Sequence, residues 1–250
     1  MKRSVHLWAV VFWLAVWQLT SMALNRSSLL VVLASPVQVL RRTAELAVTA
    51  PFWASVGFTL ARIAVGFFLA AALGVLLAAL SLRFRRVEEL LAPAMLTIRT
   101  VPVASFIILA LILFSSRNLS LLISFLMVLP VIYTNVLAGL CAADPQLSEM
   151  ARVFRLSRPR AARYLYLPQV FPYFRAACVT ALGLAWKSGV AAEVIGMPRG
   201  SIGDRLQEAK LFLDIPDLFS WTLVIVLASL AFEKAVLLLL DRGAKRLERI

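Results

Sequence analysis

The sequence has 250 residues, of which 62% are hydrophobic and 16% are charged, and its net charge at neutral pH is +13. Soluble domains are about 45–50% apolar, so this composition excludes an ordinary soluble protein and indicates an integral membrane protein. Nucleic acid is a poor explanation for the positive charge, because the apolar residues form uninterrupted runs long enough to cross a bilayer.

Six apolar segments are predicted to cross the membrane as helices, since an isolated strand would leave its backbone groups unpaired in lipid. They are Leu7–Leu24, Ser55–Leu82, Leu91–Phe114, Leu119–Leu140, Tyr173–Ile195 and Leu218–Leu240. The predicted fold class is therefore an all-α polytopic membrane protein, with a single domain over residues 1–250. Leu29–Leu40 is apolar but short and contains Pro36, which predicts a loop or an interfacial segment.

The basic residues between these spans are unevenly distributed. Fourteen of them lie in segments on the side of the two termini, and seven lie on the opposite side. Because cytoplasmic segments carry the excess of Lys and Arg, we predict a plasma-membrane protein with both termini in the cytoplasm. Cys141 and Cys178 then lie near the cytoplasmic side, where thiols stay reduced, and no disulfide is expected.

Several residues predict how the spans pack and connect. Pro102 and Pro130 interrupt the third and fourth spans and predict bends, whereas Gly66 and Gly74 predict a close approach between helices. Two segments, 36–52 and 197–214, are predicted to connect spans on the outer face. The second predicts a short amphipathic helix from its apolar residues at helical spacing, which are Ile202, Leu206, Ala209 and Leu213.

The stretch LSEMARVFRLSRPRAARYLYLP, residues 147–168, places five arginines between the fourth and fifth spans. Asp144 and Pro145 predict the N-cap and first residue of a helix that runs to about Arg155. A second helix is predicted from Ser157 to near Pro168. The expected product is a bent, amphipathic helix pair on the cytoplasmic surface, suited either to a groove on a partner protein or to anionic lipid.

This stretch resembles the EAA-x3-G-x9-I-x-L-P signature of binding-protein-dependent ABC importer permeases. Glu149-Met150-Ala151, Arg155 and Leu165-Tyr166-Leu167-Pro168 match the signature at its own spacing. The likeness continues over most of the chain, in SVGFTLARIAVGFFLAAALG (55–74), NVLAGL (135–140) and GLAWKSGVAAEVIG (183–196). The last two are most similar to the nitrate/sulfonate/taurine branch of that family.

The resemblance implies a type I ABC importer fold in which residues 141–168 dock on a separate ATPase. By position, the docking residues would be Glu149, Met150 and Ala151, and the anchors to the next span would be Leu165, Leu167 and Pro168. Arg155 would form the bend at a position where the family has glycine. We expect this turn to close without a positive φ, because Ser157 and Pro159 can start a new helix by themselves.

Charged residues inside spans mark candidate functional positions, because a basic side chain at mid-bilayer costs about 2.5–3.5 kcal/mol on insertion scales. The candidates for a translocation path, which would favour an anionic solute, are Arg62, Arg99, Trp186, Lys187 and Glu193. The alternative for Arg62 and Arg99 is that they extend toward a nearby span end. Glu193 could instead form a structural ion pair.

The predicted function is a permease subunit of an ATP-driven importer that moves a small, anionic solute by alternating access. The resemblance implies three partners: ABC ATPase subunits that hold the ATP and magnesium, a second permease copy that is identical or different, and an extracytoplasmic solute-binding protein. Contact with membrane lipid is expected, and nucleic acid is not. The sequence has no phosphate-binding glycine loop, so no catalytic residue, metal or cofactor is expected in this chain.

The identity of the solute stays open between nitrate, a sulfonate, another small organic anion and a pyrimidine vitamin precursor. Two alternative functions also remain. One is the membrane subunit of an energy-coupling vitamin importer, and the other is a membrane scaffold or membrane-bound enzyme whose basic loop binds lipid.

Overall fold

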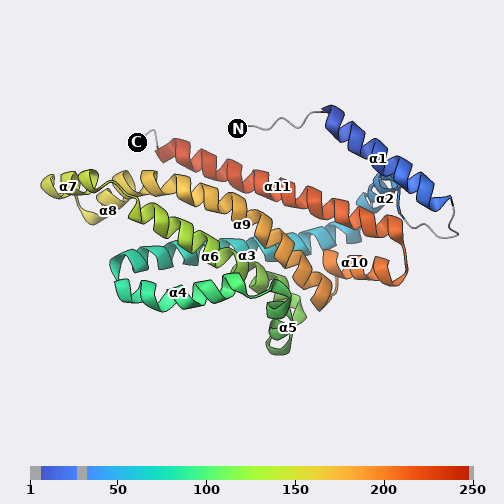
Figure 1. Ribbon diagram of the computed structural model, residues 1–250, viewed down its shortest axis with the longest axis horizontal. Helices are drawn as coiled ribbons and strands as arrows, with labels where there is room; N and C mark the ends of the chain where they lie inside the picture. Colours follow the sequence, from blue (N-terminus) through green and yellow to red (C-terminus); the bar gives the residue numbers. More distant parts are fainter. Residues whose placement is uncertain (1–6, 27–32, 248–250) are drawn as a thin grey trace.

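The computed structural model describes residues 7–26 and 33–247, which form an elongated helical bundle (Figure 1). Its helices are α1 (Leu7–Asn25), α2 (Pro36–Ala47), α3 (Ala50–Arg83), α4 (Arg85–Thr100), α5 (Val103–Leu113), α6 (Leu119–Cys141), α7 (Pro145–Val153), α8 (Arg158–Ala161), α9 (Leu167–Gly196), α10 (Ile202–Leu211) and α11 (Ile215–Leu247). A short 3₁₀ helix, η1 (Ser116–Asn118), precedes α6, and a π-helical segment, η2 (Ala162–Tyr166), precedes α9.

Among the described residues, five helices are long and apolar enough to cross a membrane, namely α1, α3, α6, α9 and α11. The pair α4 and α5 would provide a sixth span if it is counted as one broken crossing. The all-α architecture and the positions of five predicted spans are therefore confirmed.

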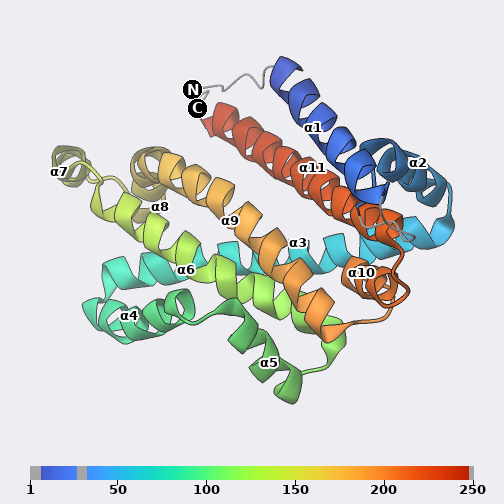
Figure 2. The same ribbon diagram turned by 45° about the vertical axis from the view of Figure 1, so that its right-hand side comes forward.

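The core of the bundle lies where α3, α6 and α9 pack side by side, as Figure 2 shows. Gly66 and Gly74 lie on the face of α3 that meets α6. A Cβ atom at Gly66 would come 2.5 Å from the Leu121 carbonyl oxygen, and one at Gly74 would come 3.0 Å from Cγ2 of Ile132. The predicted close approach is confirmed, because a Cβ atom at Gly66 would collide with the α6 backbone and one at Gly74 would crowd the Ile132 side chain.

The third predicted span is not one straight helix. α4 and α5 meet at an angle of 105° across Val101 and Pro102. Val101 is extended, with φ −72° and ψ 132°, as expected for a residue whose α conformation is blocked by the proline ring that follows. The bend predicted at Pro102 is therefore confirmed and is sharp enough to end α4, whereas α6 continues unbroken through Pro130.

The helix that leads into the fifth span differs from the prediction. The second helix of the arginine-rich stretch does not end at Pro168, because α8 and η2 run on into α9. Pro168 is the second residue of α9 and follows the π-helical segment η2 directly, with Tyr166 and Leu167 in helical conformation. Residues 158–196, from the second half of the arginine-rich stretch through the fifth span, are consequently one continuous helical run.

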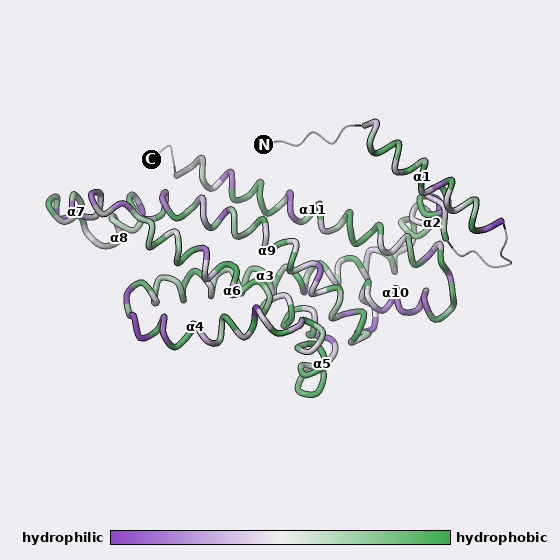
Figure 3. The backbone as a smooth tube through the Cα atoms, viewed as in Figure 1, coloured by the Kyte–Doolittle hydropathy of each residue, from purple (hydrophilic) through white to green (hydrophobic). Residues whose placement is uncertain are grey.

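We call residues 141–168 the elbow, and the part of the bundle near α7 and α8 the elbow end. The opposite end carries α2 and α10, and Figure 3 shows hydrophilic residues at both ends of the apolar bundle. α10 confirms the predicted amphipathic helix, with Ile202 and Ala209 buried, but Leu213 lies beyond its end and is exposed.

α2 was not predicted, although its start signal is present in the sequence. Ser35 Oγ accepts a hydrogen bond from the Gln38 N–H, and the Gln38 side chain accepts one from the Ser35 N–H. This reciprocal capping box, together with Pro36 at the first helical position, starts the helix. Residues 29–32, the first part of the segment Leu29–Leu40 that was predicted to be a loop or an interfacial segment, lie outside the described residues.

Candidate functional site

The side chain of Gln169 connects the start of the elbow to α9 by hydrogen bonds. α7 begins as predicted, with the Gln146 N–H donating to Oδ1 of Asp144 at 2.8 Å. The Asp144 N–H donates to Oε1 of Gln169 at 2.9 Å, and Nε2 of Gln169 donates to the Leu165 carbonyl at 3.0 Å. Gln169, which the sequence argument missed, therefore connects the start of α7 to the start of α9.

Arg155 is left-handed, with φ 49°, so the expectation of a turn without a positive φ is wrong. The Leu156 N–H donates to the Ala151 carbonyl at 2.9 Å, which is the six-residue closure of a Schellman-type helix end. Such an end needs a left-handed residue directly before the closing N–H. The family's glycine meets that need without strain, and here an arginine occupies the same conformation.

The predicted coupling residues are divided between two sides of the elbow. Glu149 and Met150 are exposed, and the neighbouring Val153 and Phe154 expose 79% and 71% of their surface. Ala151 and Leu165 are buried and line a hollow of about 680 Å³ against the end of α3, together with Arg155. Leu167 and Pro168 are exposed on the first turn of α9. The structure thus presents an uncovered apolar tip and a separate packed side.

Glu193 lies at a buried joint between three helices. Thr59 of α3 donates a hydrogen bond to Oε2 of Glu193 at 2.7 Å, and the Gly203 N–H approaches the same oxygen at 3.4 Å. The Ile202 N–H donates to Oγ1 of Thr59 at 3.0 Å. The first turn of α10 is thereby attached to α3 and to the last turn of α9, and the partners of Glu193 are hydroxyl and backbone groups.

Two other candidates for the translocation path also make contacts within the protomer. Trp186 is buried and packs edge-on against Phe232, with ring centroids 6.2 Å apart. The Arg62 guanidinium lies 3.6 Å from the centroid of the Phe58 ring, and its Nε donates to the Arg117 carbonyl at 2.6 Å. Arg62 therefore holds η1 against α3.

Arg99 and Lys187 differ from these residues because both are exposed, and neither makes an ion pair or hydrogen bond within the described ranges 7–26 and 33–247. Arg99 lines a cavity of about 400 Å³ at the break between α4 and α5, against the middle of α6 and α9. The structure thus separates the five candidates into three with internal contacts and two without.

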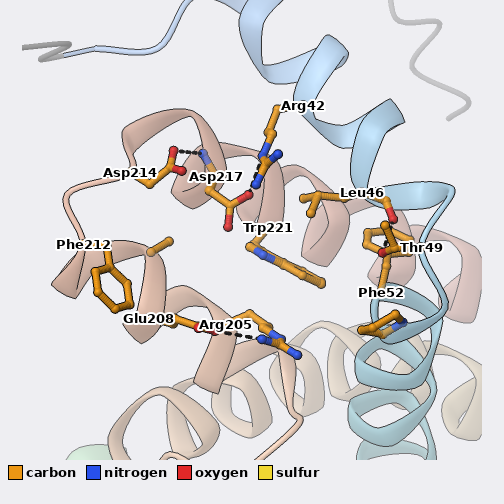
Figure 4. A pocket seen from close by; sticks show the side chains of 12 residues that line it. Arg42, Leu46, Thr49, Phe52, Arg205, Glu208, Phe212, Asp214, Asp217 and Trp221 are labelled. Carbon is orange, nitrogen blue, oxygen red and sulfur yellow. Dashed lines mark hydrogen bonds and ion pairs between the residues drawn. The ribbon is translucent and has the colours of Figure 1, made fainter.

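A second hollow, of about 470 Å³, lies at the end opposite the elbow, between α2, α10 and α11 (Figure 4). Nε of Arg42 donates to Oδ1 of Asp217 at 2.8 Å, and this hydrogen bond is the main cause that raises the pKa of Arg42 above its usual value. Arg205 pairs with Glu208 at 2.8 Å, and Trp221 stacks on Phe52. Sequence reasoning missed this hollow because its walls come from segments far apart in the chain.

Comparisons with known proteins agree with this architecture. The family model described as the binding-protein-dependent transport system inner membrane component matches residues 70–249. A Bacillus subtilis protein that carries the name aliphatic sulfonates transport permease protein SsuC is 29% identical over 195 residues, covering 77% of this chain and 70% of the relative. The nitrate import permease protein NrtB of Synechococcus elongatus is 28% identical over 193 residues, covering 73% and 68%.

A third relative, the bicarbonate transport system permease protein CmpB of Synechococcus elongatus, is 26% identical over 199 residues, covering 79% of this chain and 68% of the relative. Among solved structures, an amino acid ABC transporter with histidines shares the fold, with a TM-score of 0.53 at 16% identity over 77% of this chain and 90% of that chain.

The family match extends over the second half of α3, the α4–α5 break, α6, the elbow and α9. It favours the binding-protein-dependent importer over the two alternatives, an energy-coupling vitamin importer and a lipid-binding scaffold. This chain belongs to the family of inner-membrane components of binding-protein-dependent transport systems, and it is a multi-pass permease subunit of an ABC transporter, not a catalytic subunit.

Proposed function

We propose that this permease imports a small oxyanion, with the elbow docked on a separate cytoplasmic ATPase that binds ATP and magnesium. The observation that carries the docking proposal is the uncovered apolar tip of α7, formed by Met150, Val153 and Phe154. A short helix with such a tip at the extremity of the bundle is suited to a groove on a partner protein (Figure 1).

The mechanism we propose is alternating access, in which closure of an ATPase pair moves two elbows together. Gln169 and the continuous run from α8 into α9 support it, because they join the elbow to a helix that crosses the whole core. A displacement of the tip would pass through the Arg155 turn and the Gln169 hydrogen bonds into α9, and would so reach the Glu193 joint at the other end of that helix.

The outer partners follow from the same orientation. With the elbow in the cytoplasm, α2, α10 and the hollow around Arg42 and Trp221 face the outside, where a solute-binding protein would dock. A second permease copy would complete the path, because in this proposal two subunits form it together. The excess of basic residues near the elbow end supports this orientation.

An oxyanion is proposed because of two separate observations. Three of the relatives carry names that specify sulfonates, nitrate and bicarbonate. Arg99 at the α4–α5 break and Lys187 in α9 make no hydrogen bond or ion pair within the described residues, and an anion is the solute that such groups favour. Uptake of labelled nitrate, bicarbonate and methanesulfonate by cells expressing the whole operon, compared with uptake of neutral solutes, measures this preference.

The docking proposal is tested by replacing Phe154 with Asp and purifying the permease with its ATPase. We expect the ATPase to be lost from the complex while the permease remains in the membrane in normal amount, because the charge is placed on an exposed tip. Phe212→Asp is the matched control, since Phe212 is 77% exposed at the opposite end. Retention of the ATPase by Phe154→Asp would contradict the proposal.

A further inference from the structure

The cavity beside the α4–α5 break lies halfway along the two central helices. Its lining from α6 includes Met127, Val131 and Asn135, which are in the middle and second half of a helix that runs from 119 to 141. From α9 it receives Thr180 and Leu184, about halfway between 167 and 196. Arg99 therefore lies beside the middle of two spans, which argues against the alternative that its side chain extends toward a nearby span end.

Lys187 belongs to the same surface. Thr180, Leu184 and Lys187 follow one another at spacings of four and three residues, so they lie on one face of α9. All three are exposed in the protomer. Lys187 lies about one turn beyond the cavity in the direction of the Glu193 joint, so two basic groups occur in succession along this face.

Polar groups of the cavity suit an anion and not a cation. Its lining residues include the guanidinium of Arg99, the hydroxyl of Thr180 and the amide of Asn135, and they include no Asp or Glu. Nδ2 of Asn135 already donates to the Val131 carbonyl at 2.8 Å. Glu193, the nearest acidic residue to Lys187 along α9, is buried and hydrogen bonded to Thr59, away from this exposed face.

We propose that this surface, formed by Arg99, Asn135, Thr180 and Lys187, is a water-accessible site within the membrane that holds a small oxyanion during transit. Uncompensated basic side chains at this depth require either an aqueous cavity or a counter-anion. A cavity of about 400 Å³ accommodates a small oxyanion together with some of its water. The inference rests on the proposed function, because it assigns a place in the permease to the proposed solute class.

The test measures charge selectivity at a cysteine in the cavity. Thr180→Cys is introduced into the full chain with Cys141→Ser, since Cys141 is exposed and Cys178 is buried. The rates of modification by the anionic sulfonatoethyl and the cationic trimethylammonium-ethyl methanethiosulfonates are compared in native membranes, each relative to its rate with a free thiol. We expect about tenfold faster modification by the anionic reagent, because two nearby positive charges attract it. We also expect potassium nitrate to slow the reaction more than potassium gluconate of equal concentration.

Arg99→Gln and, independently, Lys187→Met are expected to reduce this ratio severalfold. Arg86→Gln is the matched control for the first, since Arg86 is an exposed arginine at the other end of α4, and Lys234→Met is the control for the second. Three outcomes would overturn the inference. Equal rates would indicate a neutralised surface, faster cationic modification would indicate an acidic one, and no modification would indicate that lipid covers the site. None of these outcomes depends on whether the Phe154→Asp variant binds the ATPase. Failure of this site and failure of the docking proposal are therefore distinguishable.

Discussion

Thr59 and Glu193 are 134 residues apart in the chain, and Oγ1 of Thr59 donates a hydrogen bond to Oε2 of Glu193 at 2.7 Å in the interior of the bundle. The same Thr59 oxygen accepts a hydrogen bond from the Ile202 N–H. This pair joins α3 to α9 and fixes the first turn of α10 on both. The helix that we place at the outer surface is therefore attached to the helix that begins at the elbow.

Replacing Thr59 with Val removes both hydrogen bonds and keeps the volume of the side chain. We expect a loss of about 1–3 kcal/mol in stability, because a buried carboxylate oxygen and a buried N–H lose partners. The unfolding temperature of the purified protein in detergent measures the change. Thr222→Val is the control, since the exposed Thr222 hydroxyl bonds only to Leu218 of its own helix, and an equal loss in both variants would contradict the prediction.

Gly203→Ala adds a Cβ atom that would overlap the Glu193 backbone at the contact between α10 and α9. We expect a destabilisation of about 1–3 kcal/mol, as for other overpacked sites. Gly183→Ala, in the interior of α9, meets nothing within 4 Å and should stabilise the helix by up to about 1 kcal/mol. Opposite shifts of the unfolding temperature in the two variants are the expected result, and unchanged stability of Gly203→Ala would show that the contact is loose.

Arg155→Gly should stabilise the elbow by about 1 kcal/mol, because glycine adopts the left-handed conformation of this residue without the penalty of a Cβ. Hydrogen exchange of the amides at 150–156 measures the effect locally, and we expect slower exchange. Arg160→Gly, within α8, should have the opposite effect by a similar amount. A sharp fall in transport by Arg155→Gly would assign the arginine a specific role beyond the turn.

The ion pair between Arg42 and Asp217 connects α2 to the start of α11, with 38% and 18% of the two side chains exposed. A double-mutant cycle with Arg42→Gln and Asp217→Asn should give a coupling energy of about 0.5–1 kcal/mol, which partial solvent screening keeps small. The coupling should fall in 1 M salt. The highly exposed pair of Arg85 and Glu89 is the control, and equal coupling in both pairs would contradict a specific role in holding α2.

The sequence by itself determined the approximate positions of the hydrophobic helices, because a bilayer core demands about twenty apolar residues for each crossing. It also determined the start of α7 at Asp144 and Pro145 and the amphipathic α10. These features depend on residues that are close in the chain: a cap, a proline at the first turn, or apolar residues three and four apart.

Only the tertiary structure decided what the charged residues inside the bundle do. Glu193 and Arg99 are both polar residues in apolar segments, yet one is bonded to Thr59 in the core and the other lines a cavity beside Asn135. Their surroundings come from helices that are distant in sequence, and the depth of Arg99 depends on the 105° break at Pro102. A sequence records which side chain is present, whereas its burial and partners depend on how separate helices pack.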